Sequence, residues 1–425
     1  MAGREIVERY REEAQQFVRK RVLTFARVLV ALLRGHKLAL QTTLNKAFKE
    51  LGELEQVPSA SSYCQARQKV KPEVFRYLNR IASDDYYRLG GTGDGVVRWH
   101  GRRLIGYDGT VLNLPDTPEL RAEYGVQHNQ HTSYVQAQAG VLYDLLNDIG
   151  LEGALGVKGS EQALLQDELW ERTQVGDVLV LDRNFRDYAL LARAVQNGRD
   201  IVLRCTRNGP SVVRAFWESP AVEQAVELPL PQTAATRREV RVRGLPAALA
   251  VRLVKVALPT GETEVLLTTL LDAQQFPAQE VGQVYGWRWG HETYYGRLKG
   301  IFEVERFSGT TPRAIQQDFF GVLFLATLEG ILVRRPQAQL RARDTARQTA
   351  TPAKVNRAVS YVALLDRVVV LLADPQANTE TVLSELQDVL LTNPTRHRPG
   401  RHFPRPLLKH SRRLRFHQYR KRISA

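Results

Sequence analysis

A short apolar run that ends in an acid constrains the fold of this chain most strongly. Residues 175–182 read VGDVLVLD, and no polar residue interrupts the central VLVL. A half-buried strand alternates apolar and polar side chains, so a continuous apolar run is typical of a central strand covered on both faces. Sheets of that kind carry helices on both sides. We therefore predict an α/β fold around this strand.

Helix and strand patterns alternate on both sides of this run. Residues 160–174 and 186–198 have helical spacing, and Gly198 is placed to end the second helix. Residues 200–205, DIVLRC, form a second candidate buried strand. Because the alternating stretches between residues 97 and 157 also predict strands, we assign 96–206 to the first part of a core with a mixed sheet.

The rest of the chain divides by pattern into further segments. Residues 1–90 carry helical spacing, with a hydroxyl-rich helix start at 58–62, and predict a helical domain. Residues 207–265 alternate, as in REVRVRG at 238–244, and predict a β-rich insertion. The remaining segments are a second part of the core with helices at 266–335, a polar linker at 336–350, and a C-terminal region of helices and basic tail at 351–425.

The net charge separates two classes of partner. The formal charge is +15, and residues 395–425 hold eleven Lys or Arg and no acid, so this tail carries +11 of the total. A surplus of this sign favours a polyanion, either nucleic acid or an acidic membrane surface. The longest apolar run, residues 319–333, is too short to span a bilayer and predicts a buried helix. We therefore expect nucleic acid and no membrane.

The cysteine count and the start of the chain indicate the compartment. The two cysteines lie far apart without a CxxC pattern, which argues against a zinc site and a disulfide framework. The first residues lack an apolar stretch of signal-peptide length. We expect a reducing cytoplasm.

Two aspartates occupy positions from which they can point into a cleft. Asp182 closes the buried VLVL run, where a carboxylate is costly unless it is paired or bound to a metal. An ion pair with Arg183 is the simpler alternative. Asp108 lies in LIGYDGT, which we predict to be the end of the first strand, and Gly109 permits close approach of a ligand.

A single carboxylate lies among cations and aromatic rings in VYGWRWGHETYYGRLKG, residues 284–300. At about 100° per residue, four side chains of this predicted helix share one stripe about 60° wide. They are Tyr285, Arg288, Glu292 and Lys299. A solvated helix face with an ordinary i, i+4 pair between Arg288 and Glu292 is the alternative interpretation.

The three carboxylates together predict a metal-dependent reaction. Asp108, Asp182 and Glu292 form a set of hard oxygen ligands suited to Mg²⁺ or Mn²⁺. Two such ions about 4 Å apart can promote in-line displacement at a phosphodiester. In that arrangement Tyr285, Arg288 and Lys299 would flank the ions and contact the DNA backbone.

These motifs resemble the IS-four family of bacterial insertion-sequence transposases, which are DDE enzymes. The family signature Y-x2-R-x3-E-x6-K is matched at every spacing by the four residues of the stripe. The family's first aspartate commonly lies in D-G-T, as Asp108 does, and its second in D-R, as Asp182 does before Arg183. A β-rich insertion between the second aspartate and the glutamate is also a family trait.

The resemblance implies an RNase H-like core in which Asp108, Asp182 and Glu292 are the catalytic and metal-binding residues, with two Mg²⁺ or Mn²⁺ ions. Relatives bind the terminal inverted repeats of their element, as a homodimer in the synaptic complex. They hydrolyse DNA at the transposon ends, several of them through a hairpin, and transfer the strands into target DNA. The expected partner is therefore double-stranded DNA, and the expected location is the bacterial cytoplasm, on the nucleoid when the protein binds DNA.

Further DNA contacts are expected at several places. Trp289 is the residue we expect to stack on a flipped base, although packing against the insertion is an alternative. The other expected contacts are Arg183, the helical-domain residues Arg67 and Lys69, and the tail residues Arg412, Arg413 and Arg415. For the helices, ordinary surface charge is the alternative, and for the tail a solubilising or disordered role.

Two rival functions remain at this point. A nuclease of the same fold would cut DNA without strand transfer, although such an enzyme has no need of the insertion and the tail. A domesticated DNA-binding protein that has lost catalysis would have a decayed triad, whereas all three acids are present in this chain.

Overall fold

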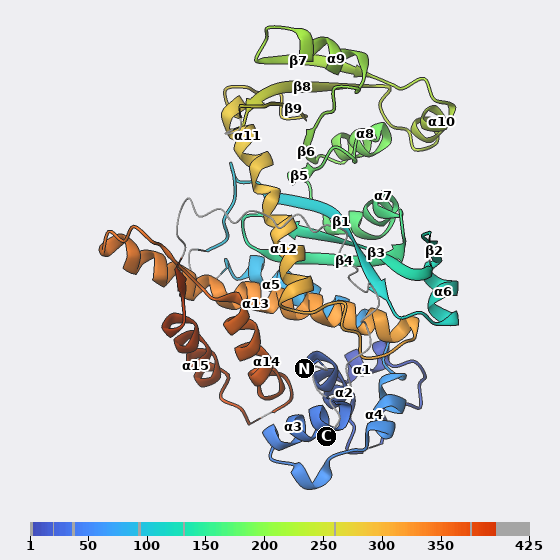
Figure 1. Ribbon diagram of the computed structural model, residues 1–425, viewed down its shortest axis with the longest axis vertical. Coiled ribbons are helices and arrows are strands. Elements are labelled where there is room, and N and C mark those ends of the chain that lie inside the picture. The colour runs from blue at the N-terminus through green and yellow to red at the C-terminus, as the bar shows by residue number, and fades with distance from the viewer. Residues whose placement is uncertain are drawn as a thin grey trace.

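One mixed sheet carries most of the strands. The structure is a computed structural model that describes residues 3–19, 21–35, 39–91, 95–130, 132–258, 261–374 and 376–396. Within these residues nine strands form a sheet in the order β2-β3-β1-β5-β6-β9-β8-β7, with β4 paired to β3 (Figure 1). The strands are β1 Leu104–Leu114, β2 Val126–His128, β3 Ser133–Asp144, β4 Ile149–Val157, β5 Val178–Leu181, β6 Asp200–Arg204, β7 Glu223–Pro229, β8 Ala248–Ala257 and β9 Thr263–Thr268. The predicted α/β class is confirmed.

The centre of the sheet combines antiparallel and parallel pairing. Strand β3 pairs antiparallel with both β4 and β1, whereas β1, β5 and β6 run parallel to one another. The order β4-β3-β1-β5-β6 is therefore an antiparallel meander with two parallel strands beside it. This topology is consistent with an RNase H-like core.

Helices cover both faces of the central strands, as the VLVL run predicts. Val178 and Val180 of β5 share a buried cluster with Val281 and Val284 of helix α11. Leu179 and Leu181 point the other way, into a cluster with helix α8. On the α11 side lie α11 Ala278–Trp287, α12 Trp289–Gly300 and α13 Pro312–Ala346, and on the other side α7 Glu161–Ala163, the π-helical segment η2 Leu164–Leu169, η3 Trp170–Arg172 and α8 Tyr188–Gln196.

The insertion differs from the prediction in two ways. Strands β7, β8 and β9 continue the main sheet beyond β6 instead of forming a sheet of their own. Two helices, α9 Ser211–Glu218 and α10 Ala234–Val242, accompany them, so residues 207–265 are less β-rich than predicted. REVRVRG lies mainly in α10, where Val240 alone of its residues is buried. The exposed arginines and glutamate have good helix propensity, and this outweighed the alternating pattern.

The N-terminal region is helical, as predicted. Its helices are α1 Arg4–Tyr10, α2 Phe25–Leu33, α3 Leu40–Glu50, α4 Ala60–Arg67 and α5 Glu73–Arg88, with the short 3₁₀ turn η1 Leu54–Gln56. Ser59 caps α4 by accepting a hydrogen bond from the Ser62 amide, in agreement with the predicted helix start. Helix α5 packs on β4 and α13 and joins this region to the core.

Helix α13 is the longest helix of the described residues, and it overturns the predicted linker. It continues through Pro336 to Ala346, across most of the predicted polar segment 336–350. Alanine, glutamine and arginine favour helix, and the buried side chains of Pro336 and Leu340 hold the extension against neighbouring elements. By length and apolar composition α13 could cross a membrane, but 67% of its most apolar stretch is buried inside the protein.

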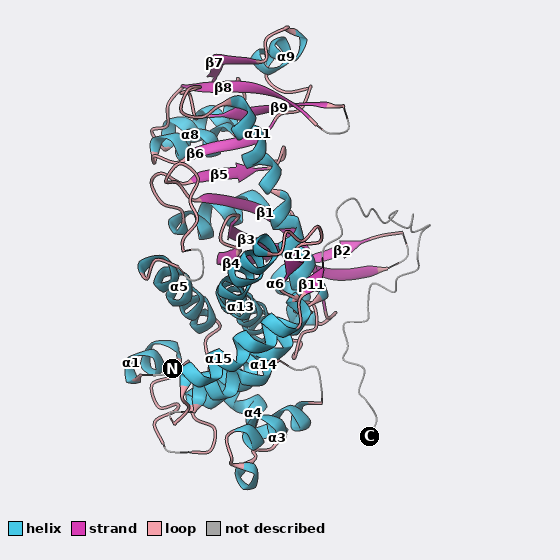
Figure 2. Cartoon of the chain, turned by 90° about the vertical axis from the view of Figure 1, so that its left-hand side faces the viewer, coloured by secondary structure: helices cyan, strands magenta, loops and turns pink. Residues whose placement is uncertain are grey.

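The C-terminal helices complete the lower part of the molecule. Helices α14 Arg357–Ala373 and α15 Thr379–Thr392 match the two predicted helices and pack against α13. The short strands β10 Ala353–Lys354 and β11 Thr395–Arg396 pair with each other. Figure 2 shows the sheet at one end of the long axis and the N- and C-terminal helices at the other. The helix α6 Pro118–Tyr124 lies beside β2 and β3.

Candidate active site

The pairing of β1 with β5 brings the two predicted aspartates together. The parallel ladder ends at the pair Tyr107↔Leu181. Asp108 and Asp182 are the next residue on each strand, so they lie side by side where the ladder opens. The buried strands β1 and β5 thus place the carboxylates of Asp108 and Asp182 at the same edge of the core.

The structure corrects the position of Asp108 within its strand. Strand β1 continues to Leu114, so Asp108 lies in the middle of the strand and not at its end. Beyond Tyr107, however, β1 pairs only with β3. The Gly109 amide, freed from the ladder on the β5 side, donates a hydrogen bond of 2.9 Å to Asp108 Oδ1.

Glu292 reaches this site through Arg288. The Arg288 guanidinium lies 3.0 Å from Glu292 Oε1 and 3.8 Å from Asp108 Oδ2. The Arg288 side chain is 12% exposed, whereas that of Glu292 is 40% exposed. Among the described residues no three acid, histidine or cysteine side chains are already arranged around an ion position. A cationic side chain therefore lies between two of the three predicted ligands.

The predicted stripe faces the sheet, but the helix that carries it is interrupted. Helix α11 ends at Trp287 and α12 begins at Trp289, and hydrogen bonds of the i to i−3 type tighten the turn at Arg288. The guanidinium of Arg288 lies over the ring of Tyr285, 5.5 Å from its centroid. Burial raises the pKa of Tyr285, and Arg288 opposes that rise.

Two side chains of α12 fix the helix against the backbone of β1. The Tyr295 hydroxyl donates a hydrogen bond of 2.8 Å to the carbonyl oxygen of Asp108. Lys299 Nζ donates one of 2.8 Å to the carbonyl oxygen of Val111, so this predicted DNA contact has an internal partner. Because both acceptors are main-chain atoms, the register of α12 on β1 does not depend on the side chains of the strand.

Sequence reasoning missed a fourth carboxylate, Glu161 at the start of α7. Its carboxylate lies over Gly109, next to Asp108: a Cβ added at Gly109 would lie closer to Glu161 Oε1 than 3.0 Å, a separation that real Cβ atoms essentially never show. Glu161 follows the end of β4 after a short turn, so the search for acids at strand ends would have found it if it had included β4.

The electrostatics confirm that three of these acids are close together. Burial raises the pKa of Asp108, and the like charge of Asp182 adds to the rise, whereas the Gly109 amide and Arg288 oppose it. Burial and the Asp108 charge raise the pKa of Glu161 to about 7. Like charges that crowd one site disfavour the ionised forms unless a cation is present.

A second charged cluster holds the other end of α12. Arg297 donates to Asp148, with one hydrogen bond of 2.9 Å, and Asp148 also receives a bond of 2.8 Å from Arg357 of α14. Arg357 pairs in addition with the buried Glu329 of α13, which accepts a bond from Ser360. The cluster joins α12, α13, α14 and the turn between β3 and β4.

The structure contradicts one of the predicted DNA contacts. Arg67 is 7% exposed, and its guanidinium bonds to Gln317 at 3.0 Å, Ser308 at 2.5 Å and Asp318 at 3.3 Å. Arg67 therefore joins α4 to α13. Its side chain is buried between these two helices and is not available to contact DNA.

The other predicted contacts have different surroundings. Trp289 is 57% exposed and Trp287 40% exposed, so both rings reach solvent beside the acids. Arg183 is exposed and Lys69 is half-buried. Arg412, Arg413 and Arg415 lie outside the described residues.

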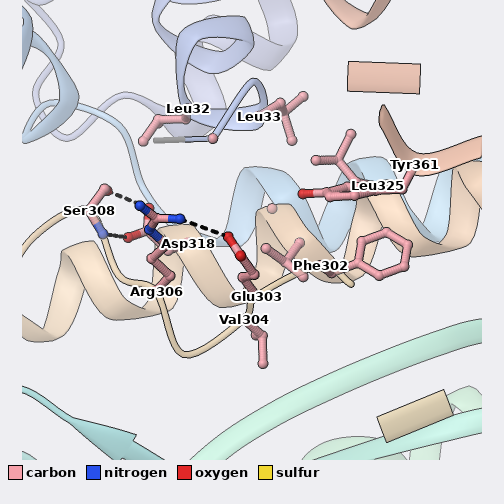
Figure 3. A pocket seen from close by; sticks show the side chains of 13 residues that line it. Leu32, Leu33, Phe302, Glu303, Val304, Arg306, Ser308, Asp318, Leu325 and Tyr361 are labelled. Carbon is pink, nitrogen blue, oxygen red and sulfur yellow. Dashed lines mark hydrogen bonds and ion pairs between the residues drawn. The ribbon is translucent and has the colours of Figure 1, made fainter. Parts of the chain in front are cut away.

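The loop after α12 encloses a small cavity. Figure 3 shows Arg306 pointing toward Glu303, with Leu32, Leu33 and Phe302 around the space. The Arg306–Glu303 pair measures 3.1 Å, and Ser308 bonds to Asp318 at 2.7 Å. With a volume of about 40 Å³ the cavity has room for a few water molecules at most and is too small to hold a nucleotide.

Comparison with known proteins identifies the family. The family described as "Transposase DDE domain" matches residues 99–328, more than half of the chain. Transposase InsG for insertion sequence element IS4, from Escherichia coli (strain K12), is 24% identical over 273 residues, which cover 63% of this chain and 60% of that protein. The chain thus spans about three fifths of the length of this curated relative.

Among solved structures, a cryo-EM structure of a piggyBac transposase synaptic complex with hairpin DNA aligns over 86% of this chain and 75% of that one. The identity is 11% and the TM-score 0.41, which is too low to establish a common fold. The family match and the IS4-element relative agree with the signature at Tyr285, Arg288, Glu292 and Lys299. This chain belongs to the DDE transposases of the IS-four family.

Proposed function

We propose that this chain catalyses cut-and-paste DNA transposition. It would bind the terminal inverted repeats of its element, hydrolyse the DNA at each end and transfer the strands into target DNA. The observation that carries the proposal is the ladder between β1 and β5, which ends so that Asp108 and Asp182 meet, with Glu292 joined to them through Arg288. Family membership supports the same chemistry.

The residues of this site fit divalent metal ions, which DDE transposases generally use. All four acids offer carboxylate oxygens, the ligands that Mg²⁺ and Mn²⁺ prefer. The Arg288 guanidinium lies between Asp108 and Glu292, where positive charge is therefore already favoured. We propose two ions, held by Asp108, Asp182 and Glu292, which when bound supply activation of the attacking oxygen and stabilisation of the leaving oxygen.

The protein's own groups would position the DNA for this chemistry. Arg288 would exchange its carboxylate partners for a backbone phosphate when a metal ion neutralises them, because its charge is then released. The ring of Tyr285 stabilises the Arg288 guanidinium through a cation–π contact. Lys299, which bonds to β1, would keep α12 in place and contribute positive charge near the strand.

The exposed ring of Trp289 supports a stacking contact with an unpaired base at the DNA end. If transposition passes through a hairpin, Trp289→Ala should reduce hairpin formation and leave the first nick intact. Trp287→Ala is the matched control on the preceding turn. Equal hairpin yields in wild type and Trp289→Ala would remove this role.

DNA binding outside the active site is also part of the proposal. Arg183 next to the site, Lys69 in the helical region and the basic tail with Arg412, Arg413 and Arg415 would contact the inverted repeats or the target. We further propose a homodimer in the synaptic complex, supported by the groove between α14 and α15, where Val362 and Val389 remain exposed.

The decisive experiment is end cleavage by the full chain. A labelled linear DNA that carries the inverted repeat flanking the gene is incubated with Mg²⁺ and wild type, Glu292→Gln or the exposed control Glu380→Gln. We expect wild type and Glu380→Gln to cut at the repeat, and Glu292→Gln to bind without cutting.

Three other outcomes would change the assignment. Equal cutting by Glu292→Gln would remove the glutamate from the catalytic set. Binding without cutting by wild type would favour a DNA-binding protein. Cutting by wild type without joining to a target plasmid would favour a nuclease that lacks strand transfer.

A further inference from the structure

We infer that Glu161 is a fourth carboxylate of the metal centre, acting beside Asp108 and Asp182. This inference rests on the proposed function, and it assigns a role that the three-acid signature does not include. Three observations support this inference. The Glu161 carboxylate occupies the space over Gly109, no cationic side chain among the described residues pairs with it, and a hydrogen bond from Tyr107 holds its backbone.

The sheet reserves space for the Glu161 carboxylate. Gly109 follows Asp108 on β1, and a Cβ at this position would lie 2.5 Å from Gln138 Nε2 and closer still to Glu161 Oε1. Any larger residue at 109 would displace the glutamate or the glutamine. In the pair Asp108-Gly109, Asp108 supplies one carboxylate, and the missing side chain of Gly109 leaves room for the Glu161 carboxylate from α7.

The Glu161 carboxylate lies next to the Gly109 amide and the Asp108 carboxyl, and these partners do not balance its charge. Among the described residues, no Lys, Arg or His side chain forms an ion pair with Glu161. Its charged neighbours are Asp108 and Asp182, which repel it. A partly buried carboxylate beside like charges is destabilised in its ionised form, and a bound cation would offset that repulsion.

The backbone that carries Glu161 is fixed by Tyr107 of β1, whose side chain lies on the same face of the sheet. The Tyr107 hydroxyl donates a hydrogen bond of 2.7 Å to the Glu161 carbonyl oxygen, and the ring of Tyr107 is fully buried over Gly140. Tyr295 holds the carbonyl of Asp108 in the same manner, at 2.8 Å. Two buried tyrosines on opposite faces thus set the relative position of the two acids.

A divalent ion is the ligand that these features select. A DNA phosphate would be repelled by the acids, and a single monovalent cation would leave most of the charge uncompensated. When ionised, the four acids and Arg288 sum to four negative charges against one positive charge. Hard divalent ions are bound by such sets of carboxylate oxygens.

The test measures Mn²⁺ binding by the full chain, using electron paramagnetic resonance and titration calorimetry, together with the melting temperature without metal. The variants are Glu161→Gln, the positive comparator Asp182→Asn and the exposed control Glu171→Gln from the same helical segment. We expect Glu161→Gln to weaken Mn²⁺ binding at least about tenfold. Its metal-free melting temperature should equal or exceed that of wild type, because one repelling charge is removed. Glu171→Gln should behave as wild type in both measurements.

Each contrary result has a separate meaning. Wild-type Mn²⁺ affinity in Glu161→Gln, with binding lost in Asp182→Asn, would overturn the role of Glu161 and leave the proposed function standing. No Mn²⁺ binding by wild type would remove the metal centre and this inference together. A lower metal-free melting temperature for Glu161→Gln would also overturn the inference, because a carboxylate that stabilises the fold needs no ion.

Discussion

Helix α12 connects two acidic clusters whose charges are balanced in opposite ways. Near its start, Glu292 and Asp108 lie beside the guanidinium of Arg288, and Asp182 and Glu161 add two acids next to Asp108 that have no ion pair among the described residues. Five residues after Glu292, Arg297 reaches the other cluster, in which Asp148 and Glu329 are matched by Arg297 and Arg357. The Glu292 side chain is 40% exposed and that of Asp148 is 30% exposed, so exposure alone does not distinguish the two clusters.

The pKa of Asp148 and the pKa values of the active-site acids shift in opposite directions for this reason, although burial also raises the pKa of Glu329 beside Asp148. Burial would raise the pKa of Asp148, but Arg357 and Arg297 outweigh it and hold that pKa well below its ordinary value. In the other cluster burial prevails and the pKa values of Asp108 and Glu161 rise. A balanced cluster stabilises the fold by itself, whereas an unbalanced one needs an external cation, as a catalytic metal site does.

The largest expected effect comes from changing the unbalanced cluster. Asp182→Asn should lower end cleavage on the order of 10⁴-fold, because it removes a ligand on which the whole site depends. Its free energy of unfolding without metal should not fall, since one repelling charge disappears. Cleavage assays and urea denaturation of the same preparation check both parts. A destabilised Asp182→Asn would mean that this cluster, like the other, is structural.

The balanced cluster should respond in stability. Arg297→Met leaves Asp148 with Arg357 as its remaining guanidinium, and the loss of charged hydrogen bonds should cost about 1.5–3 kcal/mol of unfolding free energy. Arg4→Met removes the exposed Arg4–Glu8 pair and should change stability by less than about 1 kcal/mol. Urea denaturation of the two variants gives the contrast. Similar small losses in both would show that the Asp148 cluster contributes little.

Measuring the free energy of unfolding at a series of pH values tests the contribution of Asp148 to stability. The folded-state pKa of Asp148 is depressed, so its contribution to stability is present above the unfolded value of 3.8 and is lost as pH falls toward the folded pKa. Wild type should therefore lose stability between about pH 5 and pH 3, and Arg297→Met should lose less over that interval. Urea midpoints at each pH measure the slope. Parallel slopes would contradict the assignment to Asp148.

The smallest expected effect concerns the anchor between α12 and β1. Tyr295→Phe removes the hydrogen bond to the Asp108 carbonyl and should cost about 1 kcal/mol of unfolding free energy. The neighbouring Tyr294 is a matched control, because its buried hydroxyl has no hydrogen-bond partner among the described residues. Tyr294→Phe should be neutral or stabilising. A larger loss in Tyr294→Phe than in Tyr295→Phe would refute the anchoring role.

The sequence predicted those parts of the fold that depend on local pattern. The VLVL strand, the flanking helices and the stripe from Tyr285 to Lys299 followed from spacing, and the structure has them. REVRVRG and residues 336–346 were assigned wrongly, because exposed arginine-rich segments fit a helix as well as a strand or linker. Packing against the rest of the protein decided both.

The site was predictable to the extent that its acids lie at strand ends. Asp108 and Asp182 were found in this way, whereas Glu161 follows the end of β4 at a helix start, and its proximity to Asp108 shows only in the structure, over Gly109. Arg67 shows the reverse error, because charge on an amphipathic helix does not reveal whether another helix covers it. Non-local contacts of this kind leave no periodic signal in the sequence.

The continuity of the sheet has a consequence for how the chain can be divided. Strand β6 pairs with β5 on one side and with β9 on the other, and its residues Ile201 to Leu203 are buried. Cutting out residues 207–265 would leave Leu266 to Thr268, which pair with β6, but remove their other partner β8, and cutting out β9 as well would leave one edge of β6 unpaired. The insertion is therefore not a detachable module. Shortening it in an engineered variant, or during evolution, requires a new strand or cover for that edge.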